Sequence, residues 1–505
     1  MMLSLGHLAA ESRVWTDAKG RKVDAELSGV ESDRALLVLA NGKEMGFPIK
    51  ELSDADRDYI ARHQENIAIA AAMGVFPVPT AEKRERPDLV SLKRLQAAVN
   101  EVSDQVYQSA SFQFTSQSPL SDSSANTIAQ AFEVTKLLVE ALPWGVKCRP
   151  LEEEGFYQAR IFESQAAYHK EGGPSNSSGV YLLKDKVFIL PIQSLSADGK
   201  SSVSRNKGES TATLTHEITH QMMHHYLPFL PMWVAEGSAE YVSLLPFTGR
   251  QYRISGAANG LKKYADQFRG EETLPDLWSF LRMPRKEWEA ISNGRRGQLT
   301  IESQREIPPG VELYAQSTFL LYYFNHLDGD GSGLRFNRFM DVTRETMMEW
   351  GHYNVKFAAY SKKFNEVYKV AAAAHQAKID IYNAKLKAYR AEMDEFLKLP
   401  GVQLKDGRVY YPRNLKMPDA SHLQDPGDGP VPPKPPEMPD ESPEAAAMKN
   451  VEVLLDGRTM GELNAEFIEK INKVLPNLQV KKLISPDPMP EPGLIPGPRP
   501  WLPME

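Results

Sequence analysis

Short runs in which polar and apolar side chains alternate fill the beginning of the chain. Alternation of this kind is typical of strands that bury one face, and four such runs lie between residues 12 and 52. Asn41-Gly42, between the third and fourth runs, is typical of a tight hairpin turn. A helix is expected near Ser53–Ile60, because serine is a favoured N-cap residue. The pattern predicts a small N-terminal β-barrel of the SH3-like kind over residues 12–62.

The centre of the chain mixes strand-like and helical patterns. An alanine-rich helix that gives way to prolines and a charged run predicts a linker over residues 63–88. Beyond it, residues 158–162 alternate like a strand, whereas Thr127–Leu142 has the periodicity of a helix. The mixture predicts an α+β domain over residues 89–345.

The last part of the chain predicts a helical and disordered extension. Residues 356–398 carry apolar side chains at helical spacing, which predicts one long helix or a helical hairpin. Residues 412–447 are dense in proline and acidic side chains, so we expect them to be disordered or extended. A strand and then a helix are expected over 449–476, and a disordered tail over 485–505.

Composition narrows the functional classes. A chain of 505 residues is expected to form more than one domain. A net charge of −7 with mixed signs argues against nucleic acid as a partner, and no apolar run reaches the length of a membrane span. The single cysteine, Cys148, excludes a disulfide framework and a zinc site built from thiolates. A metal would therefore rely on histidine and carboxylate ligands.

The sequence leaves two cellular compartments as alternatives. Residues 1–12, MMLSLGHLAAES, resemble the end of a secretory signal whose basic n-region is missing. An incomplete signal would imply export to the periplasm or the cell exterior. An ordinary frayed terminus would leave the cytoplasm as the alternative.

The segment His216-Glu217-Ile218-Thr219-His220 carries the strongest chemical signal. Residues four apart lie on one face of a helix, so His216 and His220 can direct a ring nitrogen at one ion. Glu217, between them, can reach a water molecule held by that ion. The spacing predicts a Zn²⁺ site.

A third ligand is expected from the later run WVAEGSAEY. Glu236 can complete the zinc ligands, and Glu240, one helical turn further, can hold a histidine ligand in place. A third histidine in the extended HExxHxxGxxH pattern is excluded, because Met223 and Tyr226 occupy the required positions. His224 lies one turn after His220, but three ligands on one straight helix cannot converge on one ion. We therefore expect it to pack or to support a ligand.

Two residues are expected to act on the reacting groups. A zinc ion with two imidazoles and one carboxylate keeps a position for water and lowers its pKa. Glu217 is the candidate general base. Tyr314, at the start of an apolar helix, is the candidate donor to a developing oxyanion, with simple packing as the alternative.

Two apolar runs, 179–183 and 187–191, predict a hairpin just before the HEITH helix. An edge strand there offers unpaired backbone groups to an extended peptide. The candidate substrate-binding residues are therefore Gly179, Val180 and Tyr181.

A glycine-rich segment that starts at Asp328 begins like a calcium-binding loop. Phe339 stands at its twelfth position, where such loops carry a glutamate. A turn between two helices is therefore the expected role, with calcium as the alternative.

The N-terminal pattern RxWTD, then an NGK turn and LSxADRxYI, resembles the Sla-type homology domain, a small barrel with an adaptor role. The resemblance covers residues 12–62 and implies a peptide ligand for the barrel. An accessory barrel without a ligand is the alternative.

HEITH followed by WVAEGSAEY resembles the gluzincin metallopeptidases, a peptidase MA-like group that includes thermolysin. The resemblance implies a zincin-like domain in which His216, His220 and Glu236 bind zinc and Glu217 is the base. It also implies that Glu240 is the acidic partner of a histidine ligand. A closer similarity is to an uncharacterised bacterial family of planctomycete type, which shares the later YAQS helix. No exopeptidase signature is present, so endo- and exopeptidase activity both stay open.

The sequence thus predicts a zinc-dependent peptidase that hydrolyses peptide bonds of a peptide or protein substrate. The alternative is a catalytically silent peptidase-like domain that binds protein through the N-terminal barrel. An intact Glu217 argues against the alternative, because an inactive domain is free to lose its base.

Overall fold

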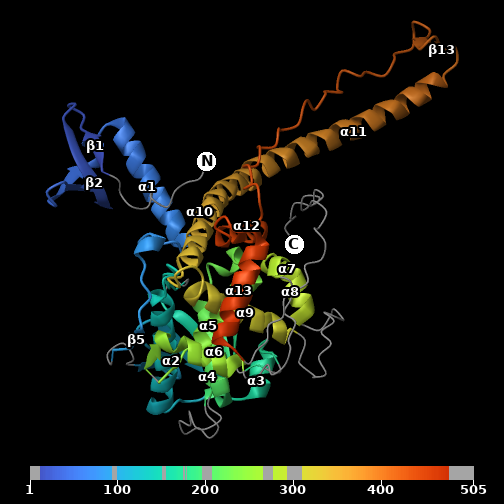
Figure 1. Cartoon of the computed structure of the whole chain (residues 1–505). Coiled ribbons are helices and arrows are strands. Elements are labelled where there is room, and N and C mark those ends of the chain that lie inside the picture. The colour runs from blue at the N-terminus through green and yellow to red at the C-terminus, as the bar shows by residue number, and fades with distance from the viewer. Residues whose placement is uncertain are drawn as a thin grey trace. The chain divides into compact units, whose positions relative to one another are not determined.

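The computed structural model describes residues 12–93, 99–150, 155–174, 177, 179–195, 208–248, 250–265, 277–292 and 310–476. The signal-like residues 1–11 and the tail 485–505 lie outside these ranges. The chain divides into two compact units, shown in Figure 1. One combines residues 1–349 with 440–505, and the other comprises residues 350–439.

The first part of the first unit is an antiparallel sheet whose strands pair in chain order. They are β1 (Arg13–Thr16), β2 (Lys22–Glu31), β3 (Arg34–Leu39) and β4 (Glu44–Pro48). Trp15, Leu27 and Leu37 alternate with exposed residues and form its core. The indole N–H of Trp15 donates to the Ala25 carbonyl at 2.9 Å. The expected N-terminal antiparallel sheet and the mixed α+β class are confirmed.

Helix α1 (Asp54–Ala72) follows this sheet and is longer than predicted. The Ser53 side chain accepts from the Asp56 backbone N–H, so the expected N-cap is present. The helix continues into the range 63–88, where we expected an alanine-rich helix before the prolines of the linker. The reason is that the alanine-rich sequence lacks glycine and proline until Gly74, whose φ of +67° favours glycine. A short 3₁₀ helix, η3 (Ala81–Lys83), interrupts the rest.

A six-stranded sheet supports the candidate site. In spatial order its strands are β10 (Val180–Leu182), β11 (Val187–Pro191), β9 (Tyr157–Phe162), β8 (Phe112–Ser116), β7 (Val106–Gln108) and β6 (Asn100–Ser103). Strands β8, β9 and β11 run parallel, and β10 pairs antiparallel with β11 as the edge strand. A separate pair joins β5 (Leu89–Ser91) to β12 (Gln251–Arg253).

Helices pack against this sheet and against one another. They are α2 (Asp122–Ala141), α3 (Gln165–Lys170), α4 (Gly208–Met222), α5 (Met232–Ser243), α6 (Ala257–Ala265), α7 (Leu277–Leu281), α8 (Arg285–Ser292), α9 (Val311–His326) and α10 (Leu334–Lys363). Phe132 of α2 packs edge-on against Phe112, Phe114 and Phe188 of the sheet, with ring centroids 5.1–5.2 Å apart. Gln221 of α4 donates to the Gln158 carbonyl of β9 at 2.9 Å, which ties α4 to the sheet.

Gly237 sets the distance between α5 and α9. A Cβ atom at this position would lie 2.7 Å from Leu321 Cδ2 and 2.8 Å from the Ser317 carbonyl oxygen. Only glycine therefore permits this close approach of the two helices. Because α5 carries Glu236 and α9 carries Tyr314, the same glycine sets how near these two side chains lie.

The segment 440–476 returns to the first unit. It contains α12 (Pro443–Asn450), η9 (Val451–Leu454) and α13 (Met460–Val474). The structure has a 3₁₀ helix at 451–454 where we predicted a strand over the start of 449–476. Val451 and Leu454, three residues apart, are both fully buried, which matches the three-residue repeat of a 3₁₀ turn.

Asp328 lies in the turn between α9 and α10 and is 5% exposed. Its Oδ1 atom accepts from Arg335 and from Arg458, each at 2.8 Å. Two guanidinium groups therefore compensate the carboxylate that opens the calcium-like segment. The segment forms a turn between two helices, and Asp328 also connects α9 to the returning chain near α13.

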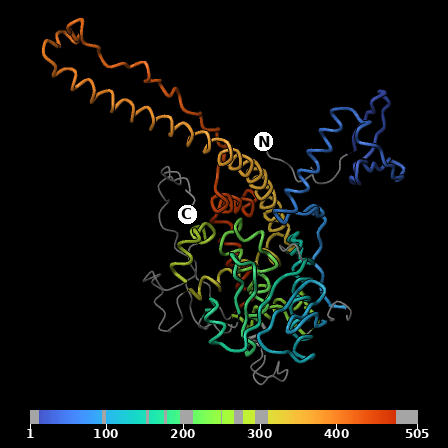
Figure 2. The backbone as a smooth tube through the Cα atoms, turned by 180° about the vertical axis from the view of Figure 1, so that it is seen from behind, coloured from blue at the N-terminus to red at the C-terminus, as the bar shows by residue number. Residues whose placement is uncertain are grey.

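The second unit is built on one continuous helix that comprises the end of α10, a π-helical turn (Phe364–Tyr368) and α11 (Lys369–Leu397). A hairpin of β13 (Gln403–Lys405) and β14 (Arg408–Tyr410) follows. The proline-rich chain then returns beside α11, as both Figure 1 and Figure 2 show. Pro430, Pro433, Pro436 and Pro439 are half-buried. A three-residue repeat of burial is typical of a polyproline II helix.

An aromatic and apolar stripe runs along this helix, and its Tyr389 and Phe396 contact the returning chain. It contains Trp350, Tyr353, Phe357, Tyr360, Phe364, Tyr368, Ala372, His375, Ile379, Tyr382, Leu386, Tyr389, Met393 and Phe396. The spacing follows a seven-residue repeat, with one additional residue inside the π-helical turn. Phe396 lies 5.3 Å from Tyr411, and Tyr389 lies 6.4 Å from His422, between ring centroids.

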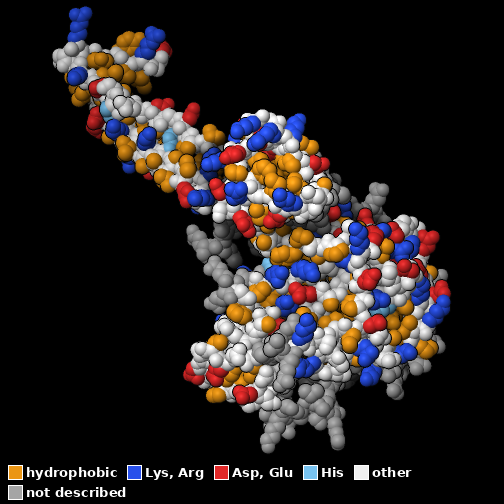
Figure 3. Space-filling model, turned by 90° about the vertical axis from the view of Figure 1, so that its left-hand side faces the viewer, with side chains coloured by type: hydrophobic (Ala, Val, Ile, Leu, Met, Phe, Trp, Pro, Cys, Tyr) orange, Lys and Arg blue, Asp and Glu red, His pale blue; other side chains and the backbone are white. Residues whose placement is uncertain are grey.

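The described part of the chain contains no helix with both the length and the apolar character needed to cross a bilayer. On the face drawn in Figure 3, basic and acidic side chains are interspersed rather than gathered by sign.

Candidate metal centre

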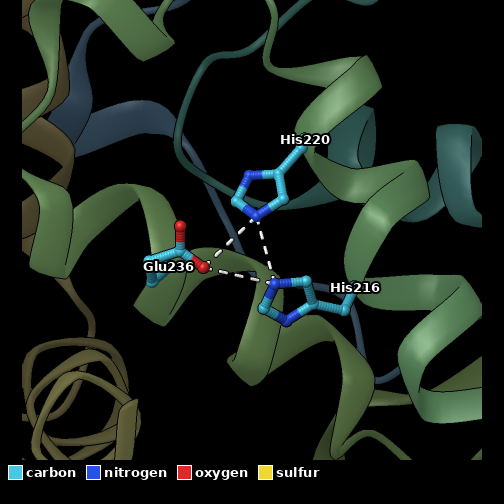
Figure 4. A group of neighbouring side chains, drawn as sticks. All are labelled: His216, His220 and Glu236. Carbon is cyan, nitrogen blue, oxygen red and sulfur yellow. Dashed lines mark hydrogen bonds and ion pairs between the residues drawn. The ribbon is translucent and has the colours of Figure 1, made fainter. Parts of the chain in front are cut away.

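Two helices bring three ligand-type side chains together (Figure 4). His216 and His220 lie one turn apart on α4, and Glu236 comes from α5. The two Nε2 atoms are 3.1 Å apart, and Glu236 Oε2 lies 3.3 Å from that of His216 and 3.4 Å from that of His220. Within the described ranges, these residues are the one group of three His, Cys, Asp or Glu side chains that converges in this way.

These distances fit a tetrahedral zinc site. Ligand atoms at tetrahedral corners lie about 3.4 Å apart when each metal–ligand bond is about 2.1 Å long. The three measured separations of 3.1, 3.3 and 3.4 Å fall close to that value. Two imidazoles with one carboxylate are also a ligand set that leaves a fourth position for water or substrate. The residues present therefore fit a zinc ion.

Glu240 supports His216 from the opposite side of the ring. Its Oε1 atom lies 3.2 Å from His216 Nδ1, so Nε2 is left to face Glu236 and His220. Burial alone would lower the pKa of His216, but the bonds to Glu236 and Glu240 raise this pKa well above its ordinary value. Burial alone would raise the pKa of Glu236, but the two histidines hold it well below its usual range.

Glu217 is linked to the edge strand of the sheet. The backbone N–H of Tyr181 donates to Glu217 Oε2 at 3.1 Å. The same tyrosine places its hydroxyl 2.7 Å from His224 Nδ1. Burial lowers the pKa of His224 to about 4, with His225 and Lys186 as further causes. His224 therefore contacts the edge strand and lies outside the group of candidate ligands, as we expected of a packing residue.

Tyr314 lies beside the ligands. Its ring centroid is 6.5 Å from that of His216, and the buried Trp288 packs against it edge-on at 5.9 Å. Burial raises the pKa of Tyr314, and the carboxylates of Glu236 and Glu240 raise it further. The phenol therefore keeps its proton at neutral pH and can donate it in a hydrogen bond.

A cleft of about 260 Å³ opens onto these groups. The lining residues are Val180, Tyr181, Leu183, His216, Glu217, His220, Leu227, Met232, Ala235, Glu236, Arg285 and Tyr314. Val180 and Tyr181 of the predicted substrate-binding set line it, whereas Gly179 is not among the lining residues. The Gly179 N–H donates to Ser177 Oγ at 3.1 Å, so this residue shapes the approach to β10.

Sequence reasoning missed Arg285 and the apolar residues Leu227 and Met232 of the cleft. Leu227 and Met232 follow the HEITH helix closely, so their distance along the chain was a usable signal. Arg285 lies far along the chain on a short helix with no recognisable motif, and nothing in its neighbourhood marked it.

Residues 8–67 match the model of the family SLA1 homology domain 1, SHD1. The N-terminal resemblance is thereby confirmed. The matched segment ends before α4, so it carries no information on the metal centre. No match was found among curated proteins or among solved structures.

Proposed function

We propose that the chain is a zinc-dependent peptidase of the gluzincin type. The observation that carries the proposal is the convergence of His216, His220 and Glu236 to within 3.1–3.4 Å of one another. These residues would hold the ion, and Glu240 would orient His216. Bound there, zinc supplies a Lewis acid that polarises a carbonyl group and lowers the pKa of water.

Glu217 moves the proton in the proposed reaction. It follows His216 on α4 and lines the same cleft, so its carboxylate can take a proton from the attacking water. The same carboxylic acid then gives this proton to the departing amine nitrogen as the peptide bond breaks. Tyr314 donates a hydrogen bond to the oxyanion and keeps its proton throughout.

Strand β10 is the proposed platform for the substrate backbone. It is the edge of the six-stranded sheet, and Val180 and Tyr181 line the cleft. An extended peptide can add to such an edge through main-chain hydrogen bonds. The Tyr181 N–H already donates to Glu217. A substrate carbonyl that accepted from this N–H would compete with that hydrogen bond.

A second candidate function rests on the SHD1 match at residues 8–67. In this alternative the N-terminal module, a small barrel of the SH3-like kind, binds a protein or peptide and the α+β domain is catalytically silent. Protein binding by this module would also be compatible with peptidase activity, because the matched residues and the metal centre lie in different parts of the chain.

The test compares the native chain with Glu217→Gln and with the control Glu171→Gln, an exposed glutamate after α3. Zinc is measured by elemental analysis, and cleavage is measured on a mixed peptide library. We expect about one zinc per chain in all three proteins and cleavage that is lost in Glu217→Gln alone. Stoichiometric zinc without cleavage in any of them would favour the silent domain, and absence of zinc would refute the metal centre.

A further inference from the structure

Arg285 is the first residue of α8 and lines the same cleft as His216, Glu217 and Glu236. Of the described residues that line the cleft, it alone carries a permanent positive charge. Of the other lining residues, Leu227 and Met232 are apolar, and the Leu227 carbonyl contacts the Arg285 guanidinium group. A guanidinium group in such surroundings is less well hydrated than on an open surface.

Two hydrogen bonds hold Arg285 at the cleft. Its backbone N–H donates to Glu444 Oε1 at 2.7 Å, and its Nη2 atom donates to the Leu227 carbonyl at 3.1 Å. Glu444 belongs to α12, and Leu227 begins the short 3₁₀ helix η6 (Leu227–Phe229) after α4. The arginine is thus held from two sides, and these bonds use only one side-chain nitrogen.

The guanidinium group has no carboxylate partner among the described residues. Glu444 accepts from the Arg285 backbone, while the neighbouring Arg282 pairs with Glu452. Nε and Nη1 of Arg285 therefore keep their N–H groups for another acceptor in the part of the cleft that the structure describes. Arginine presents its donors in a fork that matches the two oxygens of a carboxylate.

The position of Arg285 is also fixed relative to the reacting groups. Trp288 lies one helical turn later on α8, is 1% exposed, and packs edge-on against Tyr314. Tyr314 in turn lies beside His216. Arg285 is therefore held on the wall of the cleft that also carries the proposed oxyanion donor.

We infer that the cleft contains a carboxylate-binding subsite formed by Arg285, and that its substrates are peptides with a carboxylate close to the scissile bond. This inference rests on the proposed peptidase function. The carboxylate can be the free C-terminus of the peptide or the side chain of an aspartate or glutamate. In either case the peptide gains a charge-assisted, bidentate hydrogen bond that a neutral peptide lacks.

Binding tests the subsite independently of cleavage. The full chain with Glu217→Gln, loaded with zinc, is titrated calorimetrically with matched peptides that carry an apolar residue at the centre. The peptides of the first pair end in a free carboxylate or in an amide. In a further set of pairs, one position at a time carries glutamate in one peptide and glutamine in the other. We expect one of these carboxylates to tighten binding about 10- to 100-fold.

Adding Arg285→Gln should abolish this preference and leave the binding of neutral peptides within about twofold. Arg285→Lys should restore part of it, because a single positive charge remains without the fork. Lys286→Gln is the control, since this neighbour on α8 is exposed and does not line the cleft. Thermal unfolding of each variant checks that the fold is intact.

The outcomes separate the two proposals. Equal affinity for the acidic and neutral peptide of every pair would overturn the subsite, even if the native chain cleaves peptides. So would a preference for the acidic peptide that remains in Arg285→Gln. An Arg285-dependent preference supports the subsite even if the native chain cleaves nothing, and in that case the peptidase proposal fails instead. The acid–amide and glutamate–glutamine pairs show which source of the carboxylate is used.

Discussion

The backbone N–H of Tyr181 donates to Oε2 of Glu217 at 3.1 Å, which joins the edge strand β10 to the helix that carries both histidines. The candidate base is therefore positioned by main chain and not by a second side chain. A substitution of Tyr181 by any residue except proline keeps this donor, because it belongs to the backbone. The same contact places the proposed substrate platform directly beside the proposed base.

Glu240→Ala should weaken zinc binding without abolishing it. The Glu240 carboxylate orients His216 through its Nδ1 atom, and removal of such a supporting group typically costs about 10- to 100-fold in metal affinity. Competition with a chelator of known affinity measures the change. Glu171→Ala serves as the control, and an affinity equal to that of the native chain would show that Glu240 has no supporting role.

Gly237→Ala should destabilise the first unit. The new methyl group would lie 2.7 Å from Leu321 Cδ2 and 2.8 Å from the Ser317 carbonyl, and overpacking of this kind costs about 1–3 kcal/mol. Gly461→Ala is the matched control on α13, where the nearest atom would be 3.9 Å away. There alanine should stabilise by about 0.5–1 kcal/mol, because glycine is the poorer helix former.

Urea unfolding measures both glycine variants. If Gly237→Ala and Gly461→Ala moved the unfolding midpoint in the same direction, the proposed close packing of α5 on α9 would be wrong. The zinc content of Gly237→Ala should fall in parallel, since the substitution also displaces the neighbouring Glu236.

Tyr314→Phe should leave zinc content and stability nearly unchanged and reduce turnover. Loss of one donor to an oxyanion typically lowers kcat about 100- to 1000-fold with a small effect on KM. Tyr322→Phe, on the same helix but outside the cleft lining, controls for loss of a phenol. Turnover by Tyr314→Phe at the native rate would assign Tyr314 to packing alone.

Glu466 should stabilise the first unit in a pH-dependent way. Burial opposes its ionisation, but Lys470 and Arg458 lower the pKa of Glu466 to about 2, from an ordinary value of 4.5. A carboxyl group with a depressed pKa stabilises the fold above its unfolded pKa, and this stabilisation is lost as pH falls through the folded pKa. Glu466→Gln should therefore be less stable than the native chain at neutral pH.

The difference should be about 0.5–1 kcal/mol at pH 7, because the ion pairs are partly exposed, and should shrink between about pH 4.5 and pH 2. Urea unfolding at several pH values measures it. Glu469→Gln is the control. Glu469 lies on the exposed face of α13 and pairs with the exposed Lys473, so its replacement should have a smaller effect. A difference that grew on acidification would contradict the assignment.

The convergence of the candidate ligands could be predicted from the sequence because local rules determine most of it. His216 and His220 share one helix, so their spacing alone puts both rings on one face. Glu236 lies on the next α-helix along the chain, which limits where it can be. Arg285 is different, because its place in the cleft depends on hydrogen bonds to Glu444 and Leu227, and no local pattern encodes such distant contacts.

Element boundaries were harder to predict for the same reason. The run from Val451 alternates in a way that favours a strand, yet Val451 and Leu454 are buried together in a 3₁₀ turn. Tertiary packing outweighs a short alternating pattern. In α1, by contrast, nothing in the sequence stops the helix before Gly74, so the two helical stretches that we expected separately form one helix.

The π-helical turn at Phe364–Tyr368 keeps the stripe on one face of the helix. One residue turns an α-helix by about 100°, so if this turn were an ordinary α-helical one the stripe would break into two halves that face different directions. Beyond the turn, Ala374, Lys378 and Lys385 would then take the places of His375, Ile379 and Leu386 on that face. Deletion of one residue from this turn should leave the packing of the prolines on the stripe unchanged, because an ordinary helical turn would restore the same alignment. A deletion near Ala384 should instead detach the proline-rich segment from the helix.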